Sequence, residues 1–156
     1  MRTLALTLLL LLSLAACNTR GGRLDPDDFV MAMFTDHTAV VIDVRTAEEF
    51  AQGHLYKSRL IDWSQTQQFD SAVSLLPRSS TYYIYCRQGG RSAKAAALMR
   101  RKGLTVVELE GGTEAWRKAG LPLEKGAPRR PRPENEEHEV YYKDGEWIIP
   151  VIRTTR

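Results

Sequence analysis

Four short apolar runs, each bounded by turn residues or charges, recur along the middle of the chain and predict four β-strands. Within each run the apolar residues are consecutive and do not alternate with polar ones, a pattern typical of strands buried on both faces. Such strands belong to a parallel sheet that is covered by helices. The predicted strands are residues 39–42, 60–61, 82–85 and 105–109.

Helical signals fill the intervals between these strands. Two of the segments start with capping residues: Asp25 precedes a proline and two acids, and Thr46 has Glu49 three residues later, as in a capping box. Another segment is rich in alanine and ends in basic residues, which suit a helix C-terminus. The predicted helices are residues 25–34, 46–52, 69–76, 90–102 and 112–119. Because strands and helices alternate, the sequence predicts an open α/β sheet with right-handed crossovers.

Composition divides the chain behind the signal region into three parts. Residues 24–124 are expected to form one compact domain with a limited core. Residues 125–139 are rich in proline, arginine and glutamate, a composition typical of an extended linker. In the tail, residues 140–156, Asp144-Gly145 between apolar groups predicts a β-hairpin. Trp147 and Ile148 would dock this hairpin on the domain or on a partner, the alternative being a frayed tail.

The first sixteen residues have the pattern of a secretory signal. Arg2 precedes a run of 13 mostly apolar residues, 4–16, which is shorter than the roughly 20 residues of a membrane span but suits the core of a signal peptide. The junction Leu14-Ala15-Ala16-Cys17 resembles the lipobox of bacterial lipoproteins. That resemblance implies acylation of Cys17, a tether over residues 17–23, and a periplasm-facing protein anchored in the cell envelope by lipid.

The residue that follows Cys17 bears on which membrane would hold the protein. Asn18 stands where an aspartate would retain a lipoprotein in the inner membrane, so the resemblance favours the outer membrane. In the alternative interpretation, Cys17 is an ordinary residue near a signal that is cleaved elsewhere or not at all.

Charge and cysteine content exclude several other classes of protein. The 156 residues carry 22 basic and 19 acidic side chains, a formal net charge of +3, without the strongly basic face of a nucleic-acid binder. Two cysteines cannot build a disulfide scaffold, and the three histidines have no zinc-ligand spacing. We therefore expect no metal, no other cofactor and no nucleic-acid partner.

The candidate chemistry lies at Cys86, which follows the predicted strand 82–85 and precedes the alanine-rich helix. In open α/β sheets the carboxyl ends of the strands are where ligands bind. The intervening loop contains Gly89 and Gly90, which allow backbone N–H groups to point inward, and Arg87 and Arg91, which add positive charge. These surroundings favour a thiolate, so Cys86 is predicted to be a nucleophile within an anion-binding loop. The alternative is an inert, buried cysteine.

Three blocks of sequence resemble, in the same order, those of the single-domain rhodanese family. They are Asp43-Val44-Arg45-Thr46-Ala47-Glu48-Glu49-Phe50 with Gly53-His54, the loop 86–92, and Glu110-Gly111-Gly112-Thr113-Glu114-Ala115-Trp116 with Ala119-Gly120-Leu121-Pro122. The resemblance covers residues 24–124 and implies a five-stranded parallel sheet flanked by helices. It also implies thiosulfate sulfurtransferase-like activity.

By this resemblance Cys86 takes a sulfane sulfur from a small anionic donor such as thiosulfate, becomes a persulfide, and passes the sulfur to cyanide or a thiol. The persulfide is a covalent intermediate and needs no cofactor. A protein acceptor of unknown identity is a further possibility. The residues implied to bind the donor and stabilise the thiolate are Arg87, Gln88, Gly89, Gly90, Arg91 and Ser92.

The first block is expected to support the loop. Asp43 and Arg45 lie at the end of a neighbouring strand, and we expect Arg45 to pair with Glu49. His54 is interpreted as a capping or packing histidine, since an oriented thiolate needs no general base. One departure from the family is that Leu55-Tyr56-Lys57-Ser58-Arg59 replaces its usual small proline-glycine-alanine turn.

Two other classes of protein compete with a sulfurtransferase. Rhodanese-related phosphatases also combine a cysteine, an arginine and a helix N-terminus. Their loop has five residues between the cysteine and the arginine, whereas only four residues lie between Cys86 and Arg91. Tyr85 also stands where such phosphatases commonly have histidine. The other class is a non-catalytic binding module in the envelope or a partner in a persulfide relay. The intact Cys86 loop argues against an inert module and is compatible with a relay partner.

Overall fold

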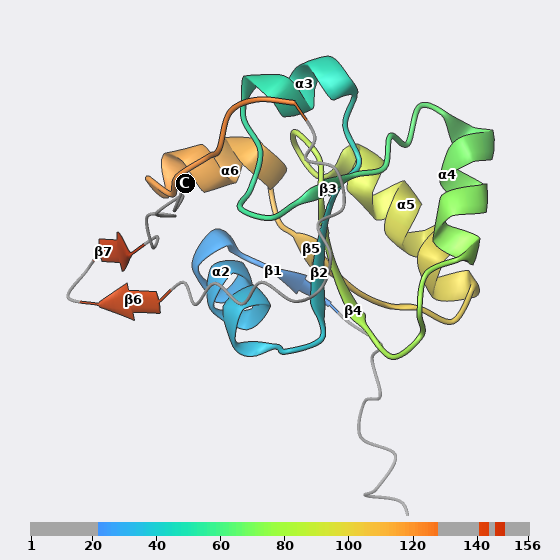
Figure 1. Ribbon diagram of the computed structural model, residues 1–156, viewed down its shortest axis with the longest axis horizontal. Helices are drawn as coiled ribbons and strands as arrows, with labels where there is room; N and C mark the ends of the chain where they lie inside the picture. The colour runs from blue at the N-terminus through green and yellow to red at the C-terminus, as the bar shows by residue number, and fades with distance from the viewer. Residues whose placement is uncertain (1–21, 128–140, 144–145, 149–156) are drawn as a thin grey trace, which may run out of the picture.

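A five-stranded, wholly parallel sheet forms the centre of the domain (Figure 1). The structure, a computed structural model, describes residues 22–127, 141–143 and 146–148. The strand order is β1-β5-β4-β2-β3. The strands are β1 Arg23–Leu24, β2 Ala39–Asp43, β3 Arg59–Leu60, β4 Thr81–Tyr85 and β5 Thr105–Leu109. The expected fold class is confirmed, with β1 as an additional short strand that the apolar pattern did not predict.

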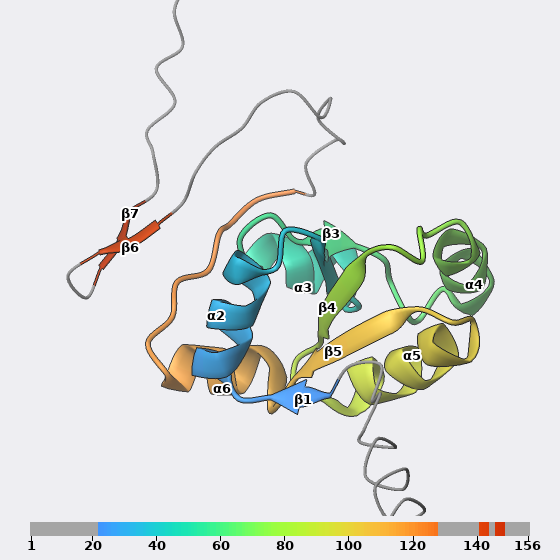
Figure 2. The same ribbon diagram turned by 90° about the horizontal axis from the view of Figure 1, so that it is seen from below.

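Helices cover both faces of this sheet. Figure 2 shows α2 and α6 on one face and α4 and α5 on the other. The helix α3 lies at the end of the sheet where β4 leads into α5 (Figure 1). The helices are α2 Pro26–Thr35, α3 Ala47–Gln52, α4 Thr66–Ser74, α5 Gly90–Arg101 and α6 Gly112–Lys118. All five predicted helices are therefore confirmed, with ends that differ by up to three residues.

Caps fix the starts of the first two helices. The Asp25 carboxylate accepts from the backbone N–H of Asp28 at 2.9 Å, which begins α2. Thr46 and Glu49 form the predicted capping box at the start of α3, where each side chain accepts from the other residue's backbone N–H. Local sequence therefore determines where these helices begin.

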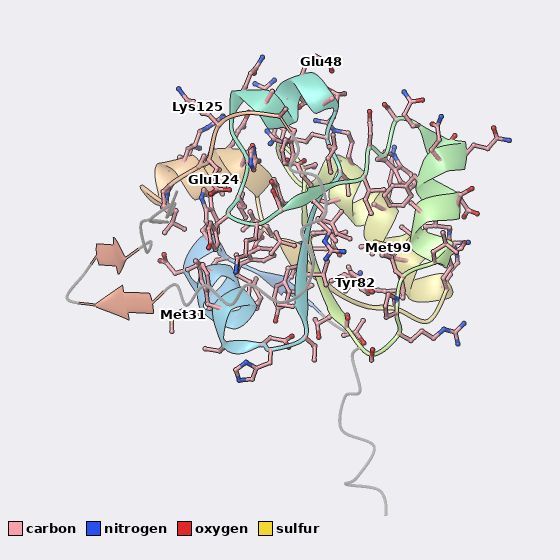
Figure 3. All side chains as sticks on the ribbon, in the orientation of Figure 1. Met31, Glu48, Tyr82, Met99, Glu124 and Lys125 are labelled. Atoms are coloured by element: carbon pink, nitrogen blue, oxygen red, sulfur yellow. The ribbon has the colours of Figure 1, made fainter. Side chains whose placement is uncertain are left out.

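Two apolar cores, one on each face, hold the layers together. Along β4, Tyr82 and Ile84 point into the core that also contains Met99 of α5, and Cys86 continues this side. Tyr83 and Tyr85 point into the opposite core with Phe29 and Trp116. Tyr82 and Met99 lie between the sheet and α5 in Figure 3. Burial on both faces explains why the strand sequences do not alternate with polar residues.

The tail contains the predicted hairpin strands. β6 Tyr141–Lys143 pairs antiparallel with β7 Glu146–Ile148. The expected docking of Trp147 and Ile148 concerns side chains outside the described part of the chain. The signal pattern, Cys17 and most of the linker also lie outside the described residues. Within residues 22–127, no helix is long and apolar enough to cross a bilayer.

Truncating the buried Met99 is expected to destabilise the domain far more than truncating an exposed methionine. Met99 is fully buried, so Met99→Ala leaves a cavity and should lower the free energy of unfolding by about 2 to 5 kcal/mol. Met31 is 54% exposed on α2 (Figure 3), and Met31→Ala should change it by less than about 0.5 kcal/mol. Urea denaturation of both variants measures the difference; equal losses would contradict the assigned core.

Candidate active site

Cys86 lies at the carboxyl end of the central strand β4, where a four-residue loop, 86–89, leads into α5. This loop lies beside α3 in Figure 1. The cysteine is only 2% exposed and is a free thiol. Gly89 caps α5 with a positive φ of 98°, a conformation that suits glycine. The sulfur is thereby placed at the bottom of the loop and at the start of a twelve-residue helix.

The start of α6 holds the loop from the outside. The backbone N–H groups of Thr113 and Glu114 donate to the carbonyls of Cys86 and Arg87, at 2.9 and 3.1 Å. In a trans peptide the N–H points away from the C=O, so these two bonds turn the following amide N–H groups toward the opposite side of the loop. Gly112 permits this close approach, because a Cβ there would lie 2.3 Å from the Cys86 carbonyl oxygen.

Hydrogen bonds to the sulfur favour its ionised form. The N–H of Gly89 donates to Sγ at 3.1 Å, and the hydroxyl of Ser92 lies 3.5 Å from Sγ. Burial is the largest single influence and raises the pKa of the thiol. The Ser92 hydroxyl and the backbone N–H groups of Ser92, Gln88 and Gly89 together outweigh burial, so the pKa of Cys86 lies below its usual value. A depressed pKa is what a nucleophilic cysteine requires.

Both arginines of the loop are held by carboxylates. Arg91 donates two hydrogen bonds of 2.6 Å to the two oxygens of Glu49 on α3. Arg87 donates to Glu114 at 2.8 Å, and Gln88 donates to the other oxygen of Glu114 at 2.9 Å. The positive charges expected from the sequence are therefore present in the loop, but each is compensated by a carboxylate, and it is Arg91 that has an electrostatic interaction with the thiol.

The expected Arg45–Glu49 pair is wrong. Arg45 is buried and donates to the carboxylate of Asp43, which is also buried, and to the carbonyl of Gly53 at 2.7 Å. The backbone N–H of Arg45 also donates to Asp43 at 2.9 Å, so the two residues close a local turn at the end of β2. Because Arg45 is paired with Asp43, the carboxylate of Glu49 is available to bind Arg91.

Tyr85 points to the other face of the sheet and binds the connection between α3 and β3. Its hydroxyl accepts from the N–H of Leu55 at 3.0 Å and donates to the Ser58 hydroxyl at 3.1 Å. These bonds fix the connection that departs from the family's usual turn, in which Lys57 has a positive φ of 56°. The strand residue immediately before the nucleophile therefore positions the segment between α3 and β3.

His54 packs and does not pair with the thiol. Its ring stacks on Phe50 with the ring centroids 3.7 Å apart, and Nδ1 lies 3.0 Å from the Phe50 carbonyl oxygen. This position fits the sequence-based interpretation. Trp116 is likewise buried in the core. In the described part of the chain, no cluster of His, Cys, Asp and Glu side chains could hold a metal ion.

Sequence reasoning gave no role to Glu114 or Gly112. Glu114 binds two side chains of the loop, and Gly112 allows the backbone of α6 to contact it. Both residues belong to the third family-like block. The available signals for their roles were the acidic residue in the first turn of the helix and the pair of glycines before it. The contact across to the loop was not deducible from them, since Gln88 and Glu114 are 26 positions apart in the sequence.

The sequence of this chain is similar to proteins of a known family. A model of the rhodanese-like domain matches residues 26–119, more than half of the chain. The chain belongs to the rhodanese-like family. A sulfurtransferase from Allochromatium vinosum is 29% identical over 103 residues, which cover 65% of this chain and 94% of that protein. Thiosulfate sulfurtransferase 16, chloroplastic, from Arabidopsis thaliana is 38% identical over 91 residues, with 52% and 76% coverage.

A solved rhodanese structure agrees with the topology. The crystal structure of a rhodanese-related protein from Thermoplasma volcanium matches with a TM-score of 0.57 and 27% identity, covering 65% of this chain and 96% of that one. The match to the rhodanese-like family and the sulfurtransferase relatives support sulfur transfer as the general chemistry of the domain.

Removing the hydroxyl of Ser92 is expected to make the rhodanese thiol less acidic. The Ser92 hydroxyl shares its proton between the sulfur at 3.5 Å and the Gly89 carbonyl oxygen at 3.1 Å, so Ser92→Ala should raise the pKa of Cys86 and slow alkylation of its thiol near neutral pH roughly fivefold. At high pH, where both proteins are ionised, the rates should converge. Ser74→Ala is the control, since that hydroxyl donates to the Asp70 carbonyl within α4. Unchanged pH–rate curves for Ser92→Ala would contradict the assigned hydrogen bond.

Proposed function

We propose that this protein is a lipid-anchored sulfurtransferase of the bacterial envelope, with Cys86 as the sulfur carrier. The observation that carries the proposal is the thiol itself, buried at the end of β4 and surrounded by donors that favour its ionised form. An inert core cysteine would have an apolar environment and a raised pKa.

The proposed reaction has two half reactions on one sulfur. The Cys86 thiolate attacks the outer sulfur of a donor such as thiosulfate, a new S–S bond forms, and sulfite leaves with the electron pair of the broken S–S bond. Cyanide or an acceptor thiolate then attacks the terminal sulfur of the persulfide. Thiocyanate or a new persulfide is released, and the Cys86 thiolate is restored. The N–H groups of the loop stabilise negative charge on sulfur in both states.

The loop 86–92 provides the binding surface for the donor in this proposal. Arg87 is 65% exposed, and Arg91 is partly exposed beside the thiol. Guanidinium groups bind sulfonate-like anions through paired N–H donors. Gln88, Gly89, Gly90 and Ser92 shape the loop around the sulfur.

The direct test is persulfide formation on the purified protein. After mixing with thiosulfate, mass spectrometry should show the mass of one added sulfur atom on the peptide that contains Cys86. Cys86→Ser should lose this adduct completely and still unfold cooperatively, because serine cannot form a persulfide. Sulfur loading that persists in Cys86→Ser would refute the assignment of the carrier.

Anchoring rests on the lipobox-like junction and on the direction of β1. Five residues, 18–22, lie between Cys17 and Arg23 at the start of β1, and such a segment reaches at most about 18 Å. Because β1 runs parallel to β5, the chain enters the sheet at the edge opposite the Cys86 loop. The proposed lipid at Cys17 would therefore hold the domain near the outer membrane with its active loop turned toward the periplasm.

Loss of Cys17 is expected to release the protein from membranes. Cys17→Ala removes the acceptor of the acyl chains, so the protein should shift from the membrane pellet to the soluble fraction of a bacterial lysate. Persulfide formation at Cys86 should be retained, since the two sites are independent. Continued membrane retention of Cys17→Ala would contradict acylation as the anchor.

A further inference from the structure

The ion pair between Arg91 and Glu49 occupies the end of the Arg91 guanidinium that carries its two Nη groups. Nη1 and Nη2 of Arg91 each donate to one carboxylate oxygen of Glu49, both at 2.6 Å. This is the bidentate geometry in which an arginine binds a sulfonate or phosphate. The pKa of Glu49 is lowered to about 2, mainly by this contact with Arg91, so the carboxylate is ionised throughout the physiological range. A donor that binds the two Nη groups of Arg91 must displace Glu49.

Charges around the thiol are balanced before any donor arrives. Each guanidinium has its own carboxylate, and the three pairs are Arg91 with Glu49, Arg87 with Glu114, and Arg45 with Asp43. The thiolate then adds a negative charge, which raises the pKa of Arg91 alongside the stronger effect of Glu49. A doubly charged donor therefore approaches a site without surplus positive charge and is repelled more than a singly charged donor.

Glu49 also caps α3, and this role can be separated from its charge. Its Oε2 accepts from the N–H of Thr46 at 3.2 Å, and the Thr46 hydroxyl accepts from the N–H of Glu49. Glutamine serves in a capping box as well as glutamate does. Glu49→Gln therefore keeps the start of the helix and removes the carboxylate that holds Arg91.

We propose that Glu49 determines the donor preference of the Cys86 site by acting as an internal anion on Arg91. It disfavours a dianionic sulfane donor such as thiosulfate relative to a singly charged one of similar shape. This inference rests on the proposed sulfurtransferase function. It assigns to the site a monoanionic donor class, which includes organic thiosulfonates and alkyl persulfides.

The test compares two donors that differ by one charge. Thiosulfate carries its second charge on the sulfonate group, whereas methanethiosulfonate has an uncharged methylsulfonyl group in that place. In each case the Cys86 thiolate takes the outer sulfur, the donor's S–S bond breaks, and the leaving group, sulfite or methanesulfinate, departs with the electron pair. Cyanide serves as the acceptor for both donors. Steady-state kcat/KM is measured for each donor with the wild-type protein, Glu49→Gln and a control.

Glu48→Gln is the matched control. Glu48 is the neighbouring residue on α3 and lies on its outer side (Figure 3), and the substitution makes the same change in net charge without freeing Arg91. Glu49→Gln should raise kcat/KM for thiosulfate about fivefold, mainly through a lower KM, and change that for methanethiosulfonate less than about twofold. Glu48→Gln should leave the ratio of the two kcat/KM values within about twofold of the wild-type ratio.

The outcomes separate this inference from the proposed function. If wild-type protein uses both donors and Glu49→Gln leaves their ratio unchanged, or lowers both activities together, the role of Glu49 is wrong and the sulfurtransferase assignment stands. An equal change in the ratio for Glu48→Gln would also overturn it, because the effect would then be one of net charge. If wild-type protein forms no persulfide with either donor, the proposed function itself fails and the inference fails with it.

Discussion

The site depends on one constraint, which is that a nearly buried thiol must be surrounded by enough hydrogen-bond donors to be stable as an anion. Burial alone would keep the Cys86 sulfur protonated. The Ser92 hydroxyl and the backbone N–H groups of Ser92, Gln88 and Gly89 together reverse that preference. The start of α6 contributes by binding the carbonyls of Cys86 and Arg87 from outside, which turns the N–H groups that follow them, including that of Gln88, toward the opposite side of the loop. The sheet, the glycines and α6 all act through this orientation of a few peptide groups.

Charge plays a different part from the one that the loop sequence indicates. Two arginines within five residues of a cysteine predict a strongly positive anion site, but each is bound to a carboxylate from another helix. The backbone and hydroxyl donors therefore stabilise the sulfur anion, and the guanidiniums keep the loop in register with α3 and α6. Glu49 links these functions, since it caps α3 and holds Arg91. The selectivity proposed for the site follows from that double contact.

Much of the fold could be predicted because its signals are local. Consecutive apolar residues mark the central strands, and the capping box of Thr46 and Glu49 forms as predicted. The strand β1 was missed because its two residues, Arg23 and Leu24, carry no apolar pattern and are held by pairing with β5.

The Arg45–Glu49 pair was wrong because spacing within one segment suggested it, whereas Glu49 bonds to Arg91, which is 42 positions away in the sequence. Contacts of that kind depend on how elements pack, which local patterns do not specify. The contact between Asp43 and Arg45 is of the local kind, because an aspartate side chain commonly accepts a hydrogen bond from the backbone N–H two residues later.

A direct titration of the Cys86 thiol decides whether donors outweigh burial in the folded domain. The ultraviolet absorbance of the thiolate would be followed against pH in the wild-type protein, with Cys86→Ser measured in parallel to subtract the contributions of Cys17 and the tyrosines. The balance of interactions in the loop predicts a difference curve whose midpoint lies below the pKa of an ordinary cysteine. A midpoint at or above that ordinary value would show that burial prevails, and the loop would then not be a site built for a sulfur anion.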